Sequence, residues 1–253
     1  MAVYRGLDIG TAKPTAEQMT SVPHHLVDVV EPADAYSVAR WLADAAAAVA
    51  AIRSRGRRVL FVGGTPLYLR ALRDGLDPRP GGDAEVRRRL HAVAEREGPA
   101  ALHERLAALD PAAAARIHPH DVRRIVRGLE VVEVAGRPLG GSWEAPGPEH
   151  PTFSRRMMIV DVPRRLLGDR IDRRVEGMFA AGLVAETRAA LARPGGIGST
   201  AGQAAGYAEA IEVLSGIRSE QDALRRTQQR TRQLAKRQLT WLRSFRSAVW
   251  IGA

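Results

Sequence analysis

The chain has 253 residues, of which 45% are hydrophobic and 26% are charged. This composition is typical of one large or two small globular domains and excludes the disordered and fibrous classes. The chain contains no cysteine, which excludes disulfides, thiol catalysis and thiolate metal sites. Its 38 basic and 28 acidic residues give a net charge of +10, which suits a nucleic acid, a phosphate-bearing substrate or an anionic lipid surface.

Only two of the basic residues are lysines, Lys13 and Lys236, and the others are arginines. Arginine suits bidentate contacts to phosphate, but a compositional bias of the whole genome explains the excess equally well. The longest apolar stretch, at about residues 43–52, is too short to span a bilayer. Because no basic and apolar leader follows Met1 either, we expect a cytoplasmic protein without a membrane contact.

The first third of the chain predicts an α/β unit. Residues 34–55 have apolar side chains at helical spacing and are followed by Gly56, which predicts a helix that ends there. Residues 59–62 form an unbroken apolar run, as in a parallel strand that is buried on both faces. The Gly-Gly-Thr turn 63–65 then leads into a helix at Pro66. Such a turn is a candidate ligand site, although the tripeptide alone favours a plain connection.

The middle of the chain predicts helices only. Helix starts at Asp83 and Asp110 mark residues 83–119 as a helical insertion. We expect residues 1–82 and 120–253 to form the α/β core with C-terminal helices.

A further helix is expected at residues 122–135, where Gly136 ends it and Asp121 or His120 caps its start. His118, His120 and Asp121 also have the residue types of a metal site. A capped helix start is the favoured interpretation of this group.

The rest of the chain returns to the core. We expect a loop at residues 137–156, a strand at 157–162, and helices at 164–181, 200–214 and 219–246.

The last helix is strongly basic. From Asp222 to Arg246 it has eight basic residues and no second acidic one. A solvated face is the usual explanation of a charge run, but so unbalanced a face favours a nucleic-acid partner, whose affinity would fall steeply with salt.

Two smaller motifs bear on phosphate binding. The P-loop motif needs a Gly-Lys pair, and none occurs in this sequence because Lys13 and Lys236 both follow alanine. His24 and His25 are candidates for phosphate contacts, with structural packing as the alternative for one of them.

Six stretches together carry a resemblance to a known family. They are 3–14 (VYRGLDIGTAKP), 22–25 (VPHH), 36–37 (YS), 62–65 with 67–68 (VGGT, LY), 124–125 with 129–131 (RI, LEV) and 231–243 (TRQLAKRQLTWLR). In this order they resemble the tRNA dimethylallyltransferases, also called tRNA isopentenyltransferases.

The resemblance implies transfer of a dimethylallyl group from dimethylallyl diphosphate to N6 of the adenosine 3′-adjacent to the anticodon. It implies Mg²⁺, which neutralises the departing diphosphate, and a base flipped out of its loop. It also implies an α/β core with the parallel sheet of P-loop NTPases and a helical insertion that binds the tRNA anticodon arm. We expect a monomer.

The same resemblance assigns site residues. Thr65, which would touch the target adenosine, and Arg174 are implied as catalytic residues. No metal ligand is implied. The implied substrate or tRNA contacts are Asp8, Lys13, His24, Arg87, Arg123, Arg124, Arg127, Gln203, Lys236, Arg237, Gln238, Trp241 and Arg243.

The sequence also departs from the family. In the family, a strand, a P-loop, a helix and an Asp-Ser pair precede the stretch that matches residues 3–6, and that Asp resembles a general base. None of them is in this sequence, so we expect a core without its first strand and P-loop, as in an enzyme whose given start lies too far downstream. The alternative is a truncated paralogue that binds tRNA without catalysis.

Overall fold

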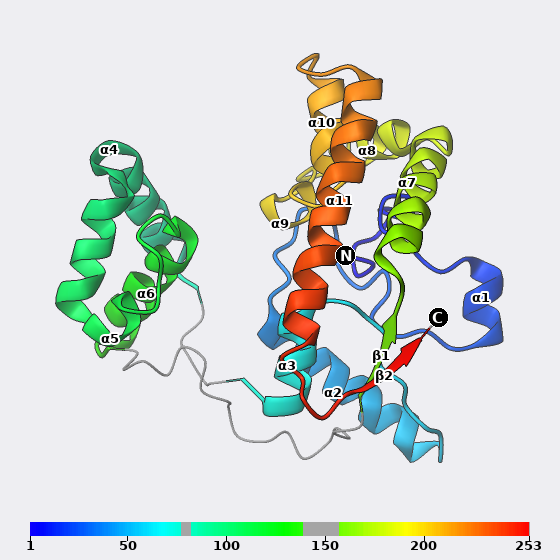
Figure 1. The fold of residues 1–253 in the computed structure, drawn as a ribbon, viewed down its shortest axis with the longest axis horizontal. Helices are drawn as coiled ribbons and strands as arrows, with labels where there is room; N and C mark the ends of the chain where they lie inside the picture. The colour runs from blue at the N-terminus through cyan, green and yellow to red at the C-terminus, as the bar shows by residue number, and fades with distance from the viewer. Residues whose placement is uncertain (77–81, 139–156, 253) are drawn as a thin grey trace. The chain divides into compact units, whose positions relative to one another are not determined.

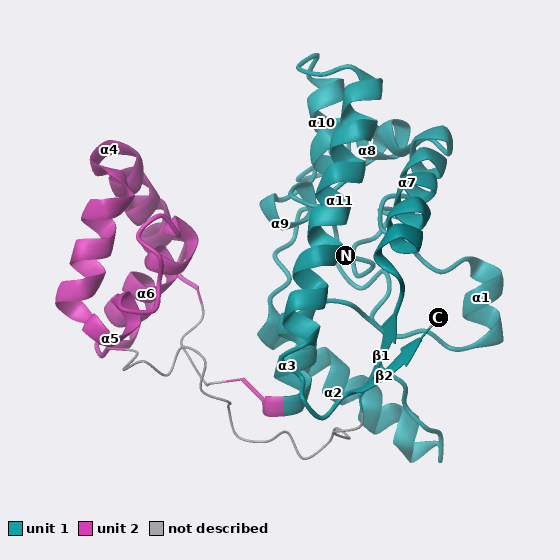
Figure 2. Ribbon diagram, in the orientation of Figure 1, with its two compact units in different colours: residues 1–73, 152–253 teal, residues 74–151 magenta. Residues whose placement is uncertain are grey.

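The computed structural model describes residues 1–76, 82–138 and 157–252. The chain divides into two compact units, which Figure 2 shows in different colours. Unit 1 consists of residues 1–73 and 152–253, and unit 2 of residues 74–151.

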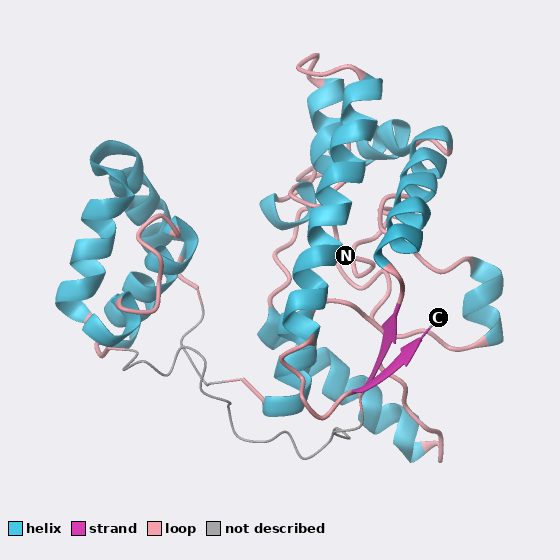
Figure 3. Cartoon of the chain, viewed as in Figure 1, coloured by secondary structure: helices cyan, strands magenta, loops and turns pink. Residues whose placement is uncertain are grey.

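Unit 1 is mainly helical (Figures 1 and 3). Its first helices precede unit 2 in the sequence, and the others follow it together with two short strands. The helices are α1 (Ala16–Ser21), α2 (Val38–Ser54), α3 (Pro66–Asp74), α7 (Arg164–Ala180), α8 (Leu183–Leu191), α9 (Ser199–Gly202), α10 (Tyr207–Leu214) and α11 (Glu220–Leu242), and the strands are β1 (Met158–Asp161) and β2 (Val249–Gly252).

Local sequence signals explain where these helices begin and end. The Ser37 and Ser219 hydroxyls cap α2 and α11 by accepting hydrogen bonds from backbone N–H groups three residues later. The helix expected at residues 200–214 is divided into α9 and α10. Gly206, with φ +98°, breaks it, because a helix cannot continue through that backbone conformation.

The core of unit 1 joins the N-terminal segment to the later helices. Tyr4 and Leu7 are buried against Val175 and Phe179 of α7 and against Leu183 of α8. The helix α11 packs on α7 and α10. Residues far apart in the sequence therefore share one apolar core. It holds in place the N-terminal loop, the largely non-helical residues 1–37 before α2.

The two strands pair in parallel, with Met158 opposite Val249. The strand expected at residues 157–162 is thus confirmed as β1. The strand expected at residues 59–62 is wrong for the structure described, since the segment is not part of the two-stranded sheet and Leu60 and Val62 are 77% and 88% exposed. A parallel strand needs a neighbour for its hydrogen bonds, and the described part of the chain places none beside this segment.

Unit 2 contains α4 (Ala84–Leu109), α5 (Pro111–Ala114) and α6 (Val122–Ala135). Each start is capped by an aspartate carboxylate, from Asp83, Asp110 and Asp121 respectively, as their positions in the sequence predict. The backbone of α4 kinks at Gly98, where φ is +85°. Gly136, in the left-handed conformation, ends α6.

Unit 2 is larger than the insertion expected at residues 83–119, because α6 packs on α4. Its core is formed by Leu102 and Leu106 of α4 with Ile125 and Leu129 of α6. The expected loop at 137–156 lies almost wholly outside the described residues. In the part of the chain that is described, no helix combines the length and the apolar character needed to cross a bilayer.

Candidate substrate and RNA-binding sites

The Gly-Gly-Thr turn at residues 63–65 starts α3. The Thr65 carbonyl accepts hydrogen bonds from the backbone N–H groups of Tyr68 (3.0 Å) and Leu69 (3.1 Å), as expected of the residue before a helix. The Thr65 side chain itself is exposed. The turn therefore presents a hydroxyl to solvent from a backbone that is fixed on its helical side.

A side chain of α11 holds the other side of this turn. The Gln238 amide Nε2 donates a 2.7 Å hydrogen bond to the Gly64 carbonyl. A Cβ atom on Gly64 would lie only 2.6 Å from that nitrogen, so a side chain at this position would displace the amide from its present place. Gln238, which the resemblance implies as a substrate or tRNA contact, is thus engaged with the turn.

Aromatic contacts fix α3 on its neighbours. The Tyr68 ring stacks on Trp41 of α2 with centroids 4.6 Å apart, and burial raises the pKa of the Tyr68 phenol. The Arg73 guanidinium lies 4.6 Å from the centroid of Phe245, just after α11. Both ends of α3 are therefore attached to the rest of unit 1.

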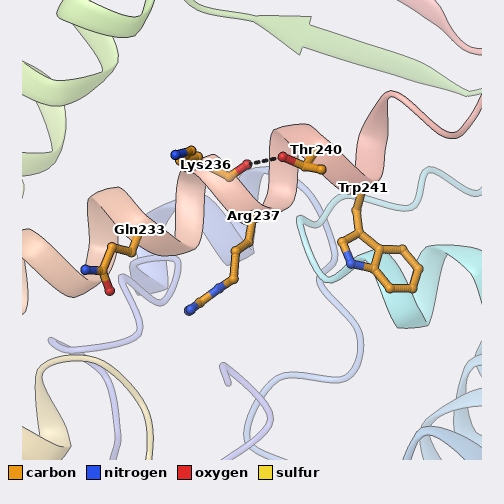
Figure 4. Close-up of a pocket in the computed structure, with 5 residues that line it drawn as sticks. All are labelled: Gln233, Lys236, Arg237, Thr240 and Trp241. Carbon is orange, nitrogen blue, oxygen red and sulfur yellow. Dashed lines mark hydrogen bonds between the residues drawn. The ribbon is translucent and has the colours of Figure 1, made fainter. Parts of the chain in front are cut away.

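One face of α11 forms a hollow of about 420 Å³ (Figure 4). Arg237 and Trp241, one helical turn apart, extend from the same side of the helix. Lys236 and Thr240 also line the hollow, and the Thr240 hydroxyl donates a 3.0 Å hydrogen bond to the Lys236 carbonyl. The structure thus brings together three of the expected RNA contacts, namely Lys236, Arg237 and Trp241.

A second hollow, of about 320 Å³, lies between α7 and α11. Apolar side chains such as Leu167 and Leu239 line it together with the basic side chains of Arg164, Lys236 and Arg243. Lys236 belongs to both hollows. Arg243, an expected RNA contact, therefore lies beside Lys236 at this second site.

The N-terminal loop uses two of the expected contact residues for its own structure. The Lys13 ammonium is almost wholly buried and lies 2.5 Å from a carboxylate oxygen of Asp8 and 2.5 Å from one of Asp28. It also donates a 2.9 Å hydrogen bond to the Tyr4 carbonyl. Lys13 therefore has its donors engaged within the loop, whereas Asp8 remains largely exposed.

Glu186 of α8 anchors the same loop. One of its carboxylate oxygens accepts hydrogen bonds from the backbone N–H groups of Asp8 and Ile9, both at 2.9 Å. The other accepts a 2.6 Å hydrogen bond from the Tyr207 hydroxyl. Burial is the main cause that raises the pKa of the Tyr207 phenol, and the hydrogen bond to Glu186 and the charge of that carboxylate raise it further. No local sequence signal points to this role, because the contact joins residues that are 178 positions apart.

Three further expected residues lie away from both hollows. His24 is exposed, and its Nδ1 is 2.6 Å from the Val22 carbonyl oxygen. Arg174 is exposed on α7. The Gln203 carbonyl accepts a 2.9 Å hydrogen bond from Arg230.

Unit 2 has its own basic surface, formed by Arg87 of α4 and by Arg123, Arg124 and Arg127 of α6. Arg123 and Arg124 are exposed, and the Arg124 Nε is 3.5 Å from an Asp121 carboxylate oxygen. Arg123, Arg124 and Arg127 are the expected contacts to the anticodon arm, and Arg87 is the tRNA contact expected at the channel to the active site; the structure places all four on α4 and α6 of unit 2.

A buried carboxylate that sequence reasoning missed holds two of these arginines. The Glu130 side chain is 0% exposed. Its carboxylate lies 2.8 Å from the Arg87 Nε and accepts hydrogen bonds from the Arg87 Nη2 (3.1 Å) and the Arg127 Nη1 (2.6 Å). It also accepts a 2.7 Å hydrogen bond from the Asp83 backbone N–H. Glu130 therefore fixes both guanidinium groups at the start of α4.

Comparison with known proteins gives a consistent match along the chain. A family model described as IPP transferase matches residues 2–245. A tRNA dimethylallyltransferase of Anaeromyxobacter dehalogenans (strain 2CP-C) is 49% identical over 98% of this chain and 83% of its own length. One of Geobacter metallireducens is 45% identical over 99% of this chain and 81% of its own.

Solved structures give the same match. The tRNA isopentenylpyrophosphate transferase of Bacillus halodurans is 36% identical, with a TM-score of 0.67 over 99% of this chain and 78% of the other. A eukaryotic dimethylallyltransferase acting on tRNA has a TM-score of 0.79 over 100% of this chain and 65% of the other. At 24% identity, this second likeness concerns the fold alone.

Proposed function

This chain belongs to the IPP transferase family, and on that premise we propose that it transfers a dimethylallyl group from dimethylallyl diphosphate to N6 of the adenosine 3′-adjacent to the anticodon in tRNA. The observation that carries the proposal is the match over nearly the whole chain to relatives named tRNA dimethylallyltransferase. The α/β fold class expected from the sequence is confirmed by the likeness to the solved transferases. The absent first strand and P-loop stay a prediction, and the relatives give no support to a paralogue that only binds tRNA.

The proposed reaction forms one bond and breaks one. The N6 nitrogen of the adenine attacks the allylic carbon, the bond from that carbon to the diphosphate oxygen breaks, and diphosphate leaves with the electron pair. N6 then loses a proton. The target base must leave its stack to reach the allylic carbon, as in other enzymes that modify bases.

Thr65 and Arg174 are the residues we propose for this step. The Thr65 hydroxyl is exposed on a turn held through the carbonyls of Gly64 and Thr65, which suits contact with the extruded adenine. The Arg174 guanidinium, exposed on α7, suits the charge of the diphosphate.

We propose that the two basic surfaces bind RNA. In unit 2, Arg123, Arg124 and Arg127 would contact the phosphates of the anticodon arm, and Arg87 would contact the tRNA at the channel to the active site. On α11, Lys236, Arg237 and Arg243 supply charge, and the Trp241 ring offers a surface on which an unpaired base stacks. Of the other expected contacts, Asp8, His24 and Gln203 keep that proposed role, and Lys13 acts through the loop that it holds.

Mg²⁺ fits this reaction as a partner of the diphosphate. Within the described residues, no three carboxylate or imidazole groups come together as a metal cage. Mg²⁺ usually keeps several waters and binds through substrate phosphates with one or two carboxylates. We therefore expect it to enter with dimethylallyl diphosphate, where it supplies charge neutralisation for the departing group.

Two variants test the proposed roles. Thr65→Ala should lower the rate of dimethylallyl transfer to an anticodon stem-loop by about 10- to 100-fold, because it removes a contact at the reacting base, while RNA affinity stays nearly unchanged. Arg124→Ala should weaken RNA binding itself, about equally for all RNA sequences, because it removes a phosphate contact.

Thr20→Ala on α1 and Arg105→Ala on α4 are matched controls, because both residues are exposed outside the proposed sites. Equal and negligible effects of all four substitutions on transfer and on binding would contradict the assigned roles.

A further inference from the structure

The hydrogen bond from Gln238 to Gly64 joins two segments of unit 1 that are 174 residues apart. Gln238 is half-buried, whereas the polar side chains nearest to it on α11, Lys236 and Arg237, are exposed. Its amide is therefore turned toward the protein and away from the solvent where an RNA would lie. This orientation separates Gln238 from the basic residues of the same helix.

Gln238 and Gly64 are also complementary in shape. The nitrogen that donates to the Gly64 carbonyl is the atom that a Cβ on Gly64 would meet, at 2.6 Å. A methyl group and the amide cannot both occupy that space, because real Cβ atoms essentially never approach another heavy atom so closely. A side chain at residue 64 would therefore displace the Gln238 amide from its hydrogen bond to the Gly64 carbonyl.

The residue that follows Gly64 is Thr65, whose hydroxyl we have placed at the reacting base. The Thr65 carbonyl is held by the first turn of α3, through Tyr68 and Leu69. On the other side, the Gly64 carbonyl is held by Gln238. The peptide between these two carbonyls sets the direction of the Thr65 side chain. Loss of the Gln238 bond therefore removes one of the two hydrogen-bonded supports of that side chain.

We propose that Gln238 is a positioning residue for the transfer reaction, which holds the Gly64 carbonyl and thereby orients Thr65, and that it is not itself an RNA contact. The proposal rests on the proposed function of the Thr65 site. A displacement of about 1 Å at a reacting group can cost about 100-fold in rate. The effect should fall on the rate constant of the bound complex and spare the affinity for RNA.

Two single variants remove the support in different ways. Gln238→Glu keeps the shape of the side chain but replaces the N–H donor with a carboxylate oxygen, which repels the Gly64 carbonyl. Gly64→Ala keeps the amide but forces it away from the carbonyl. Both should lower kcat by about 10- to 100-fold, with KM for the anticodon stem-loop and its Kd changed by less than about 2-fold.

A double-mutant cycle separates positioning from a direct role of either residue. In a Gln238→Ala background, the added methyl of Gly64→Ala has the space that the amide vacated. The double variant should therefore have the same kcat as Gln238→Ala alone, although Gly64→Ala is damaging by itself. Multiplied effects would mean that the methyl blocks the substrate directly and would overturn the proposal.

Gln228→Ala is the matched control. Gln228 also lies half-buried on α11 and donates to another element, with its amide 3.4 Å from the Asp172 carbonyl and 3.2 Å from a Glu176 carboxylate oxygen. Its loss removes a comparable contact without touching the Thr65 turn, so kcat should stay unchanged. A fall equal to that of Gln238→Ala would show a general effect on α11 and contradict positioning.

Hydrogen exchange provides a readout that does not depend on activity. The amides of Tyr68 and Leu69, which bond to the Thr65 carbonyl, should exchange faster in Gln238→Ala than in the wild type and in Gln228→Ala. Unchanged exchange, or an RNA affinity that falls in parallel with kcat, would overturn the proposal. Absence of any transfer by the wild-type protein would instead refute the proposed function, and the exchange result would still decide whether Gln238 holds the turn.

Discussion

Glu130 is the buried carboxylate that holds Arg87 and Arg127 in unit 2, and Glu130→Gln removes its charge while keeping its shape. The amide nitrogen of glutamine would face guanidinium donors where a carboxylate oxygen now accepts their hydrogen bonds. Removal of one partner of a buried ion pair typically costs about 3–5 kcal/mol. Here the Arg87 and Arg127 side chains are 48% and 28% exposed. Water can therefore solvate the two guanidinium groups once the carboxylate is gone, and we expect the free energy of unfolding of unit 2 to fall by about 2–3 kcal/mol.

Hydrogen exchange in α4 and α6 measures this loss within unit 2 itself, because protection reports the free energy of local opening. Glu133→Gln is the matched control on the same helix, since Glu133 is 31% exposed and pairs with the more exposed Arg89. A surface pair of that kind is worth less than about 1 kcal/mol. Glu130→Gln should also weaken RNA binding, because two arginines lose their orientation. The reasoning is refuted if Glu130→Gln lowers protection no more than Glu133→Gln does.

Two other predictions concern packing and charge. Gly10→Ala should lower the melting temperature, because the added Cβ would lie 2.6 Å from the Tyr207 ring and overpacking costs about 1–3 kcal/mol of stability. Gly177→Ala is the control: no atom lies near the added methyl, so the melting temperature should rise, by an amount that corresponds to at most about 1 kcal/mol of stability. A stabilising Gly10→Ala would show that the buried ring moves aside at little cost. RNA affinity should fall steeply as the salt concentration rises, and Arg124→Ala should reduce the slope of log K against log salt by about one. An affinity that does not depend on salt would exclude phosphate contacts as the main source of binding.

Local signals allowed the helices of unit 2 to be predicted from the sequence. The carboxylates of Asp83, Asp110 and Asp121 cap the helices that follow them, and a cap depends only on the next few residues. Gly136 ends α6 for an equally local reason. These boundaries are therefore visible in the sequence before any tertiary contact is known.

The strand expected at 59–62 and the contacts that Lys13 and Gln238 make depend on the tertiary fold, which local sequence signals do not specify. The apolar run at 59–62 predicted a buried strand, but an apolar run specifies neither a neighbouring strand nor a covering helix. The position of Lys13 beside Asp8 and Asp28 depends on how the N-terminal loop folds back on itself. Gln238 stands in a basic helix, and only the fold turns its amide toward Gly64. Sequence reasoning could identify these residues as important without specifying what each one touches.

Dimethylallyl transfer to RNA tests the central claim most directly. The purified protein is incubated with dimethylallyl diphosphate, Mg²⁺ and an anticodon stem-loop that has adenosine 3′-adjacent to the anticodon, and the nucleosides of the digested RNA are analysed by mass spectrometry. A stem-loop in which guanosine replaces that adenosine is the control. We predict one five-carbon prenyl group on the adenosine of the first RNA and none on the control. RNA that is bound in a salt-dependent manner but recovered without a prenyl group would contradict the account.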